Sequence, residues 1–490
     1  MCEKLYAVVG GECETDNLDS IANQEVLLSG HLYMALLQEK LFDLLLGAKA
    51  KVLKDMRSPK VEEEQMTNSN YLKKLIDAQV SIGKKMEHFL ATGNLISRTN
   101  LDLQQTAGFT IVADKLNNTR YLSHFRSIHR GQYFTEMKTT TVRKLLPECW
   151  GFLCPVHTPD GSPCGLLNHI TLSCVPVSSE IRQPEKLKLK KLLCRLGMQQ
   201  IGSDFNLVFP HNYLPVLFDG ILYGYVAPEI AGQFVKALRI VKCMTQEQRE
   251  QDDYVASFPE RAEVAFMAPY QKSVARTEEG EESPQKKEEG KEELVRNRAF
   301  PGVYISTTIA RFSRPVTNLE AGGIEWIGPL EQLELSIACL EEDIRTDTTH
   351  QELDPINMMS IIASTVPFAD YNQSPRNMYQ CQMAKQTMGT PYHNHPFRMD
   401  NKVYRLLFPE KPIVATETTE RYDFGQYPSG TNAVVAVISY TGYDMEDAMI
   451  LNKSAYERGF GHGCVYKSFR HELNESGAQG KTKQKYRLIR

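Results

Sequence analysis

The chain of 490 residues is predicted to be a mixed α/β protein with several domains. Three observations predict this class. The length allows about three or four domains. The hydrophobic content of 42% is enough to form cores. Segments with helical periodicity alternate with short apolar runs bounded by turn residues. The net charge is only −4, so any contact with nucleic acid must come from local basic patches.

Two segments near the N-terminus have the spacing of amphipathic helices. From Leu32 to Met56, apolar residues recur at helical intervals, and Ser29-Gly30 supplies a start signal. From Tyr71 to Leu90 the same pattern returns, with Asn68 or Ser69 as possible N-cap. Both helices are expected to be structural.

The middle of the chain predicts strands and one long loop. Two apolar runs, Tyr213–Phe218 and Ile221–Val226, flank Asp219-Gly220, which is a hairpin signal. Residues 276–298 are rich in Glu and Lys and have few bulky apolar groups. They cannot bury enough surface to offset the entropy of ordering, so we expect a disordered loop there.

Helices and one buried strand are predicted in the C-terminal half. A Glu-rich helix is expected over Leu330–Ile344. Asp354-Pro355 should open the next helix, with Asp as N-cap and Pro at the first helical position. Ser374-Pro375 repeats this arrangement, and Gly389 is expected to end that helix. The solid apolar run Ala433–Ile438 predicts a buried strand.

Two adjacent carboxylates, Glu446 and Asp447, follow this predicted strand in a turn that contains glycine. Carboxylates at the end of a buried strand often position a divalent cation, because hard cations bind oxygen ligands. The alternative is a solvated acidic turn, which is the usual environment of an isolated Glu-Asp pair.

The Ser374-Pro375 start places Arg376 in the first turn of a helix. Unpaired backbone N–H groups and the positive end of the helix dipole meet there, and a guanidinium adds an anion site suited to a triphosphate. Gln373 and Gln380 could support it. Lys385 lies nine residues further on, about 180° around an ideal helix, so it and Arg376 cannot both point straight into one pocket. The alternative is that Arg376 pairs with a nearby carboxylate.

Basic and aromatic side chains interleave between residues 115 and 135, a stretch without acidic residues. Basic groups neutralise phosphates, and aromatic rings can stack on bases. We expect Arg126, Arg130 and Lys138 to contact a nucleic-acid backbone. The alternative is a solvated basic face.

The cysteines do not indicate a zinc site. There are 11 of them, and no two form a C-x-x-C pair. Cys154 and Cys164, with His157 between them, lie among prolines and glycines that predict a rigid loop, so these cysteines are expected to be packed thiols. An odd number of cysteines fits a reducing compartment.

The sequence contains no secretory signal and no apolar run of about 18 residues, so no membrane span is expected.

Three long segments carry a family resemblance: residues 150–166, 372–389 and 438–450. Together they resemble the second-largest (β-type) subunit of multisubunit DNA-directed RNA polymerases, in that family's order and at plausible spacing. The sequences of Val156–Gly161 and Met378–Gln382 are most similar to those of the RNA polymerase I form.

The resemblance covers residues from about Asn23 to about Lys467 and has three departures. Ala384 stands where the family usually has Gly. The chain is expected to be truncated, since it begins and ends inside the pattern and is about half the length of the family's subunits. The stretch Gly480–Arg490 does not resemble the family and is expected to be an atypical basic tail.

The resemblance implies an incomplete architecture of protrusion, fork, external and hybrid-binding regions. The expected boundaries are 1–90 for the end of the lobe and the second half of the protrusion, 91–180 for the fork, 181–345 for the external region, 346–470 for part of the hybrid-binding region, and 471–490 for the basic tail.

The activity that the resemblance implies is template-directed RNA synthesis from NTPs. The family's arginine that matches Arg376 contacts the incoming nucleotide, and Gln373, Gln380 and Lys385 would bind substrate near it. Glu446 and Asp447 resemble this subunit's contribution beside the second, nucleotide-borne Mg²⁺, acting indirectly. The N-A-D-F-D-G-D loop that holds the permanent ion belongs to the largest subunit, and the family's zinc site lies in a clamp region that this sequence lacks.

The implied partners are the largest polymerase subunit, the other subunits, template DNA, RNA and NTPs, without a membrane. The implied location is the nucleus and nucleolus, where ribosomal RNA genes are transcribed. A different interpretation is a truncated, non-catalytic fragment that serves in binding or assembly. An unrelated nucleic-acid-binding protein would require the three long segments to coincide by chance.

Overall fold

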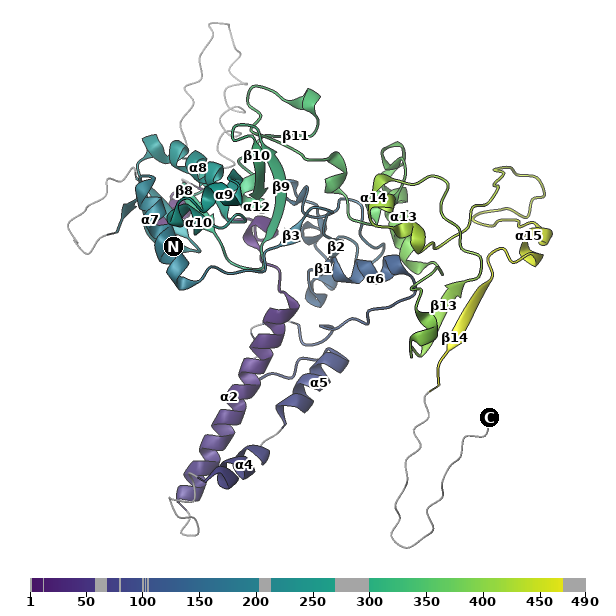
Figure 1. Cartoon of the computed structure of the whole chain (residues 1–490), viewed down its shortest axis with the longest axis horizontal. Coiled ribbons are helices and arrows are strands. Elements are labelled where there is room, and N and C mark those ends of the chain that lie inside the picture. The colour runs from purple at the N-terminus through teal and green to yellow at the C-terminus, as the bar shows by residue number, and fades with distance from the viewer. Residues whose placement is uncertain are drawn as a thin grey trace. The chain divides into compact units, whose positions relative to one another are not determined.

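The computed structural model describes residues 2–11, 13–57, 68–78, 81–98, 101, 103, 105–201, 213–268 and 299–469 (Figure 1). It contains helices and several β-sheets, which confirms the mixed α/β class. The chain forms two compact units. Unit 1 comprises Met1–Ile111 and Ser127–Ile361, and unit 2 comprises Val112–Arg126 and Ile362–Arg490. None of the helices in the described ranges has the length and apolar character needed to cross a membrane.

Unit 1 begins with helices. The structure contains α1 (Cys2–Val9), α2 (Ser29–Met56), α4 (Ser69–Asp77) and α5 (Ile82–Thr92). The predicted helix over Leu32–Met56 is confirmed by α2, in which Ser29 is the first helical residue. Leu36 of α2 packs with Met86 and Phe89 of α5 in a small core.

The single helix predicted over Tyr71–Leu90 is wrong, because the structure has two. Asn68 caps α4 as predicted, accepting a hydrogen bond from the Asn70 N–H at 3.0 Å. Ser81 starts a second helix by accepting from the Lys84 N–H at 3.4 Å. A second N-cap inside the periodic segment satisfies the free N–H groups of a new helix, so the shared periodicity does not join the two.

A five-stranded sheet in the order β4-β6-β5-β8-β7 carries the main core of unit 1. Its strands are β4 (Gln199–Gln200), β5 (Leu214–Phe218), β6 (Ile221–Val226), β7 (Glu263–Met267) and β8 (Gly302–Ser306). The predicted hairpin is confirmed. Asp219 and Gly220 connect β5 and β6 with φ values of 47° and 78°, the left-handed pair that a tight hairpin turn needs.

Helices contribute the rest of that core. They are α7 (Gln183–Arg195), α8 (Pro228–Cys243), α9 (Gln246–Arg249) and α10 (Asp253–Ala256). Leu189 and Leu193 of α7 and Phe234 and Leu238 of α8 are almost fully buried with Val216 of β5. Apolar residues at helical spacing on α7 and α8 therefore pack against the sheet.

A second sheet has the order β10-β9-β12-β11, and β3 also pairs with β9. Its strands are β3 (Val175–Pro176), β9 (Phe312–Asn318), β10 (Gly323–Ile327), β11 (Ile337–Ala338) and β12 (His350–Gln351). A separate pair consists of β1 (Ser127–His129) and β2 (Leu167–His169).

The helix predicted over Leu330–Ile344 is wrong. At the start of this range the α-helix α12 (Pro329–Gln332) ends after four residues, and strand β11 follows it. The Ser336 carbonyl accepts hydrogen bonds from the backbone N–H groups of Thr349, at 2.9 Å, and His350, at 3.0 Å. These long-range hydrogen bonds replace those that a continued helix would make, and tertiary pairing overrides the local preference.

Unit 2 contains α6 (Asn118–Phe125), α13 (Ser374–Gln386), α14 (Glu417–Arg421) and α15 (Lys453–Glu457). Its described strands, β13 (Lys402–Leu406) and β14 (Gly463–Lys467), form one antiparallel pair. Helices α6 and α13 pack on each other, although they lie far apart in the sequence (Figure 1).

The predicted caps are only partly correct. Asp354 accepts from the Ile356 N–H at 3.0 Å as expected, but it opens only a short 3₁₀ helix, Pro355–Met358. Gln373, rather than Ser374, is the N-cap of α13, so Ser374 and Pro375 occupy its first turn. This helix ends at Gln386 because Thr387 is extended, so Gly389 does not terminate it.

The buried strand predicted over Ala433–Ile438 is wrong. This segment has no regular structure and is exposed, with Val434 at 106% and Val437 at 96% relative exposure. A strand needs a neighbour for its backbone groups, and among the described residues none pairs with this segment. The predicted disordered loop 276–298 and the basic tail 471–490 lie outside the described residues.

Candidate nucleotide and nucleic-acid site

The first turn of α13 presents Arg376 to solvent. The Arg376 N–H donates to the Gln373 carbonyl at 2.9 Å, which fixes the residue in the first turn. Its guanidinium lies 5.9 Å from the centre of the Tyr379 ring, and none of the ion pairs found in the described ranges involves it. Gln373, Arg376 and Gln380 are all exposed. The helix end therefore offers N–H groups and an unneutralised guanidinium, which suits an anion.

Lys385 lies at the other end of α13 and faces α6. The Arg120 guanidinium of α6 donates to the Lys385 carbonyl at 3.5 Å. Burial lowers the pKa of the Lys385 ammonium below its ordinary 10.5, and Arg120 acts in the same direction against the opposing effect of Cys381. The structure thus separates Lys385 from the exposed turn that carries Arg376, as the helical spacing indicated.

Glu446 and Asp447 are the two central residues of a turn. The Ala448 N–H donates to the Met445 carbonyl at 3.2 Å and closes it, with Glu446 at a φ of 57°. Both carboxylates are exposed, and the turn follows an irregular segment rather than a strand. They belong to unit 2, as does Arg376.

The three predicted nucleic-acid contacts do not share one environment. Arg126 is the C-cap of α6 in unit 2, whereas Arg130 and Lys138 belong to unit 1. The Arg130 guanidinium donates to the Val142 carbonyl at 3.1 Å, pairs with Asp19 and stacks on the Phe134 ring at 4.6 Å. Lys138 is exposed. These partners already occupy part of the Arg130 guanidinium.

The loop around His157 is held by packing and hydrogen bonds. The His157 ring stacks on His169 with centroids 3.5 Å apart, and its Nδ1 lies 2.7 Å from the Ser360 hydroxyl. The Cys154 sulfur accepts from the His157 N–H at 3.3 Å and is buried, so this cysteine is a packed thiol as predicted. Cys164 is half-buried.

A buried ionic cluster joins α8 to the second sheet of unit 1, and sequence reasoning missed it. The Lys242 ammonium lies 3.0 Å from Glu325 and 2.7 Å from Glu331, and all three side chains are fully buried. Arg239 Nη1 lies 3.2 Å from both carboxylates, and His350 Nε2 lies 2.8 Å from Glu325. The sequence did contain a signal for this cluster. Arg239 and Lys242 lie at helical spacing from the buried apolar residues of α8, which indicates that they are buried too.

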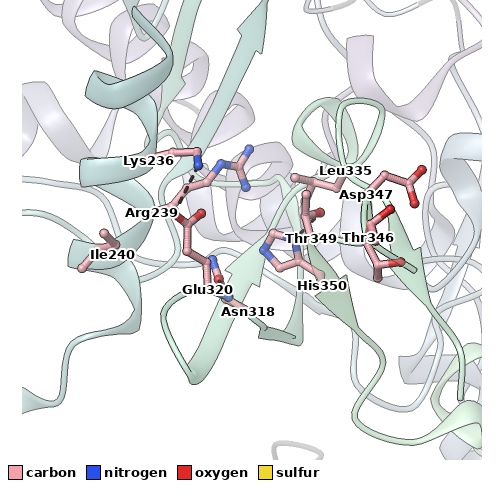
Figure 2. A pocket seen from close by; sticks show the side chains of 11 residues that line it. Lys236, Arg239, Ile240, Asn318, Glu320, Leu335, Thr346, Asp347, Thr349 and His350 are labelled. Carbon is pink, nitrogen blue, oxygen red and sulfur yellow. Dashed lines mark hydrogen bonds and ion pairs between the residues drawn. The ribbon is translucent and has the colours of Figure 1, made fainter. Parts of the chain in front are cut away.

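A cavity of about 320 Å³ opens beside this cluster (Figure 2). Arg239 and His350 form part of its wall. Lys236 and Glu320 also line it, and Lys236 Nζ donates to Glu320 Oε1 at 3.1 Å. The Arg239 guanidinium and the His350 ring are already bonded to Glu325. We therefore interpret this part of the polar wall as structural.

We expect unit 1 to lose stability in acid because of Glu325. Burial alone would raise the pKa of this carboxyl, but Lys242, His350, Arg239 and Asn318 together lower it well below its ordinary 4.5. A lowered pKa stabilises the fold fully above pH 4.5 and loses that contribution as the pH falls below it. Urea midpoints measured from pH 7 to pH 3 should fall steeply, and Glu325→Gln should flatten this dependence. An equally steep fall in Glu325→Gln would contradict the assignment.

Two family profiles match separate parts of the chain. A family profile described as RNA polymerase Rpb2, domain 3, matches residues 111–175, and one described as RNA polymerase Rpb2, domain 6, matches residues 362–488. The second match begins where the long segment of unit 2 begins. It also extends into Gly480–Arg490, which we expected to lie outside the family pattern.

Whole-chain comparison finds relatives along nearly the full sequence. The chain is 58% identical over 480 residues to DNA-directed RNA polymerase I subunit RPA2 of Euplotoides octocarinatus, covering 98% of this chain and 39% of that protein. It is 48% identical over 473 residues to subunit rpa2 of Dictyostelium discoideum, covering 96% and 39%. It is 42% identical over 475 residues to subunit RPA135 of Saccharomyces cerevisiae, covering 96% and 36%.

By these matches the chain is similar to the second-largest subunits of multisubunit RNA polymerases. Within that class it is similar to the RNA polymerase I form, as the sequence resemblance indicated. It spans less than two-fifths of the length of these relatives, 36–39% for the three named.

Proposed function

We propose that this chain forms part of the active centre of a DNA-directed RNA polymerase of the RNA polymerase I type, acting in a multisubunit complex. The observation that carries the proposal is the identity of 58% to an RNA polymerase I subunit across 98% of the chain. Its partners would be the largest subunit, the other subunits, template DNA, RNA and NTPs. Its product would be ribosomal RNA, made in the nucleus at the nucleolus.

The proposed reaction transfers a nucleoside monophosphate to RNA. The RNA 3′-hydroxyl oxygen forms a bond to the α-phosphorus of an NTP, the bond to the bridging oxygen breaks, and pyrophosphate leaves. In this reaction Arg376 and the N–H groups of the first turn of α13 bind the triphosphate, because they present positive charge without a competing carboxylate. Gln373 and Gln380 flank that turn and would orient the nucleotide.

Glu446 and Asp447 are proposed to act beside the nucleotide-borne Mg²⁺. The described residues contain no group of three or more His, Cys, Asp or Glu that could hold a metal alone. Two adjacent carboxylates in an exposed turn would act indirectly, beside an ion whose own oxygen ligands would come from the nucleotide and the largest subunit. Together with the permanent ion of the largest subunit, this Mg²⁺ would help to activate the 3′-hydroxyl and to stabilise the leaving pyrophosphate.

The region boundaries expected from sequence remain part of this proposal. We assign 1–90 to the lobe end and protrusion, 91–180 to the fork, 181–345 to the external region and 346–470 to the hybrid-binding region. The profile matches at 111–175 and 362–488 support the second and fourth assignments. In the fork-like region, Arg126, Arg130 and Lys138 are proposed to contact a nucleic-acid backbone.

The proposal is tested by co-purifying the tagged chain with the largest polymerase subunit and assaying primer extension on the eluate. A full-length version of the subunit serves as the positive control. Binding together with extension supports the catalytic proposal. Binding without extension, while the full-length version extends, supports the alternative of a non-catalytic binding or assembly fragment.

Arg376→Ala is expected to raise the apparent KM for NTPs about tenfold or more, since a hydrogen bond to a charged group contributes about 1.5–3 kcal/mol. Arg376→Lys should be intermediate, because it keeps the charge but loses the fork. The measurement is single-nucleotide extension in a reconstituted complex at varied NTP concentration. Arg421→Ala changes another exposed arginine of unit 2, in α14, and should leave the KM unchanged. If Arg376→Ala lowers only thermal stability, its assigned role is wrong.

A further inference from the structure

One buried amide connects the two packed helices of unit 2. The side chain of Asn117 is only 1% exposed and lies at the start of α6. Its Oδ1 accepts a hydrogen bond from the Arg120 N–H at 2.6 Å, so Asn117 is the N-cap of α6. This bond satisfies one of the free N–H groups at the start of the helix.

The other half of the same amide binds the end of α13. Asn117 Nδ2 donates to the Ala384 carbonyl at 2.9 Å and to the Thr387 carbonyl at 2.8 Å, and lies 3.3 Å from the Thr387 hydroxyl. The last carbonyls of a helix have no N–H partner within the helix. Thr387 is extended, so the chain turns away from the helix there and leaves these oxygens for Asn117.

A neighbouring contact also joins the two helix ends. The Arg120 guanidinium donates to the Lys385 carbonyl of α13 and is itself paired with Asp114, just before α6, at 3.0 Å. Arg120 is also the residue whose N–H Asn117 caps. The start of α6 and the end of α13 therefore share one set of hydrogen bonds, with Asn117 at its centre.

This contact bears on the proposed nucleotide site because α13 is a rigid element of 13 residues, about 20 Å long. Arg376 lies in its first turn and Asn117 binds its last turn. A change in how the last turn is held moves or tilts the whole helix, and small displacements of a substrate-binding group can cost much of its effect.

We infer that Asn117 is a positioning residue for nucleotide binding, which holds α13 against α6 so that Arg376 meets the triphosphate in the correct place. The inference rests on the proposed function. Asn117 itself touches neither nucleotide nor metal in this role and acts through α13. Its Oδ1 and Nδ2 are both required, because the first orders α6 and the second fixes α13 upon it.

The decisive variant is Asn117→Asp. Aspartate is an equally good N-cap, so α6 is retained. It has no N–H₂ group and turns a carboxylate oxygen toward the Ala384 and Thr387 carbonyls, which are acceptors only. Asn452→Asp is the matched control, since Asn452 caps α15 in the same unit, accepting from the Ala455 N–H at 3.2 Å, and is exposed.

Two measurements are made on a reconstituted polymerase complex. Hydrogen exchange by mass spectrometry reports α6 and α13 separately, and single-nucleotide extension reports the apparent KM for NTPs and the rate at saturation. For Asn117→Asp we expect faster exchange in α13 with α6 still protected. We also expect a KM about three- to tenfold higher, the effect of losing one or two hydrogen bonds. The saturated rate should stay within about twofold, because Arg376 itself is intact.

The outcomes separate this inference from the proposed function. If Arg376→Ala raises the KM and Asn117→Asp does not, the positioning role of Asn117 is wrong while the proposed nucleotide site stands. If neither variant raises the KM, the nucleotide site itself is wrong and the inference falls with it. If Asn117→Asp raises the KM but Asn452→Asp matches it, the effect is not specific to the contact with α13, and the inference is overturned.

Discussion

Replacing Glu446 and Asp447 by alanine is expected to slow nucleotide addition on the order of 10²-fold, with little effect on assembly. Preorganised charge that acts on a reacting phosphate contributes about this much per group removed. Both carboxylates are exposed in a turn without packing partners, so their removal costs the fold little. The measurement is the elongation rate of a reconstituted complex at saturating NTP, with subunit association measured alongside.

The matched control for this pair is Glu341→Ala with Glu342→Ala. Like Glu446 and Asp447, Glu341 and Glu342 are two adjacent exposed carboxylates, and they lie in a short 3₁₀ helix of unit 1. Their replacement changes the net charge by the same amount as the replacement of Glu446 and Asp447. The control should extend at the normal rate. An unchanged elongation rate in the Glu446 and Asp447 variant would remove both carboxylates from the proposed metal site.

Lys242→Met is expected to destabilise unit 1 by about 3–5 kcal/mol, the usual cost of removing one partner from a buried ion pair. Methionine has a similar shape but removes the ammonium that pairs with both Glu325 and Glu331, whose side chains are fully buried. The free energy of unfolding from urea titration measures this loss.

Lys236→Met provides the comparison on the same helix. Lys236 pairs with Glu320 at 3.1 Å, but both side chains are more than 60% exposed, so the change should cost less than about 1 kcal/mol (Figure 2). Adding Glu331→Gln to Lys242→Met should restore part of the loss, because it removes the unpaired charge. Equal losses for the two lysine variants would refute the importance of the buried cluster.

Several features followed from local sequence signals. The hairpin at Asp219-Gly220 was predictable because two residues with left-handed φ suit those residue types. Helix α2 was predictable from its periodicity, and Asn68 and Asp354 cap the segments expected of them. Arg376 lies in a first turn as predicted, since Pro within that turn already favours a helix start.

The family resemblance was also present in the sequence alone. Three long segments pointed to the polymerase subunit, and the relatives found along 96–98% of the chain confirm it. The resemblance of residues 438–450 did not depend on the strand expected just before them. Residues 433–438 are exposed and, among the described residues, unpaired.

The polymerase-subunit resemblance, the mixed fold, the hairpin and the place of Arg376 in its helix could all be inferred from the amino-acid sequence. Three features became visible in the folded chain alone: Leu330–Ile344 is not a helix, Lys242 is buried between two glutamates, and Asn117 bonds to the ends of two helices. The two groups of features differ in the distance along the chain over which their interactions act. Caps, turns and periodicity act within a few residues, whereas strand pairing, burial of charge and shared caps depend on groups brought together from distant parts of the chain.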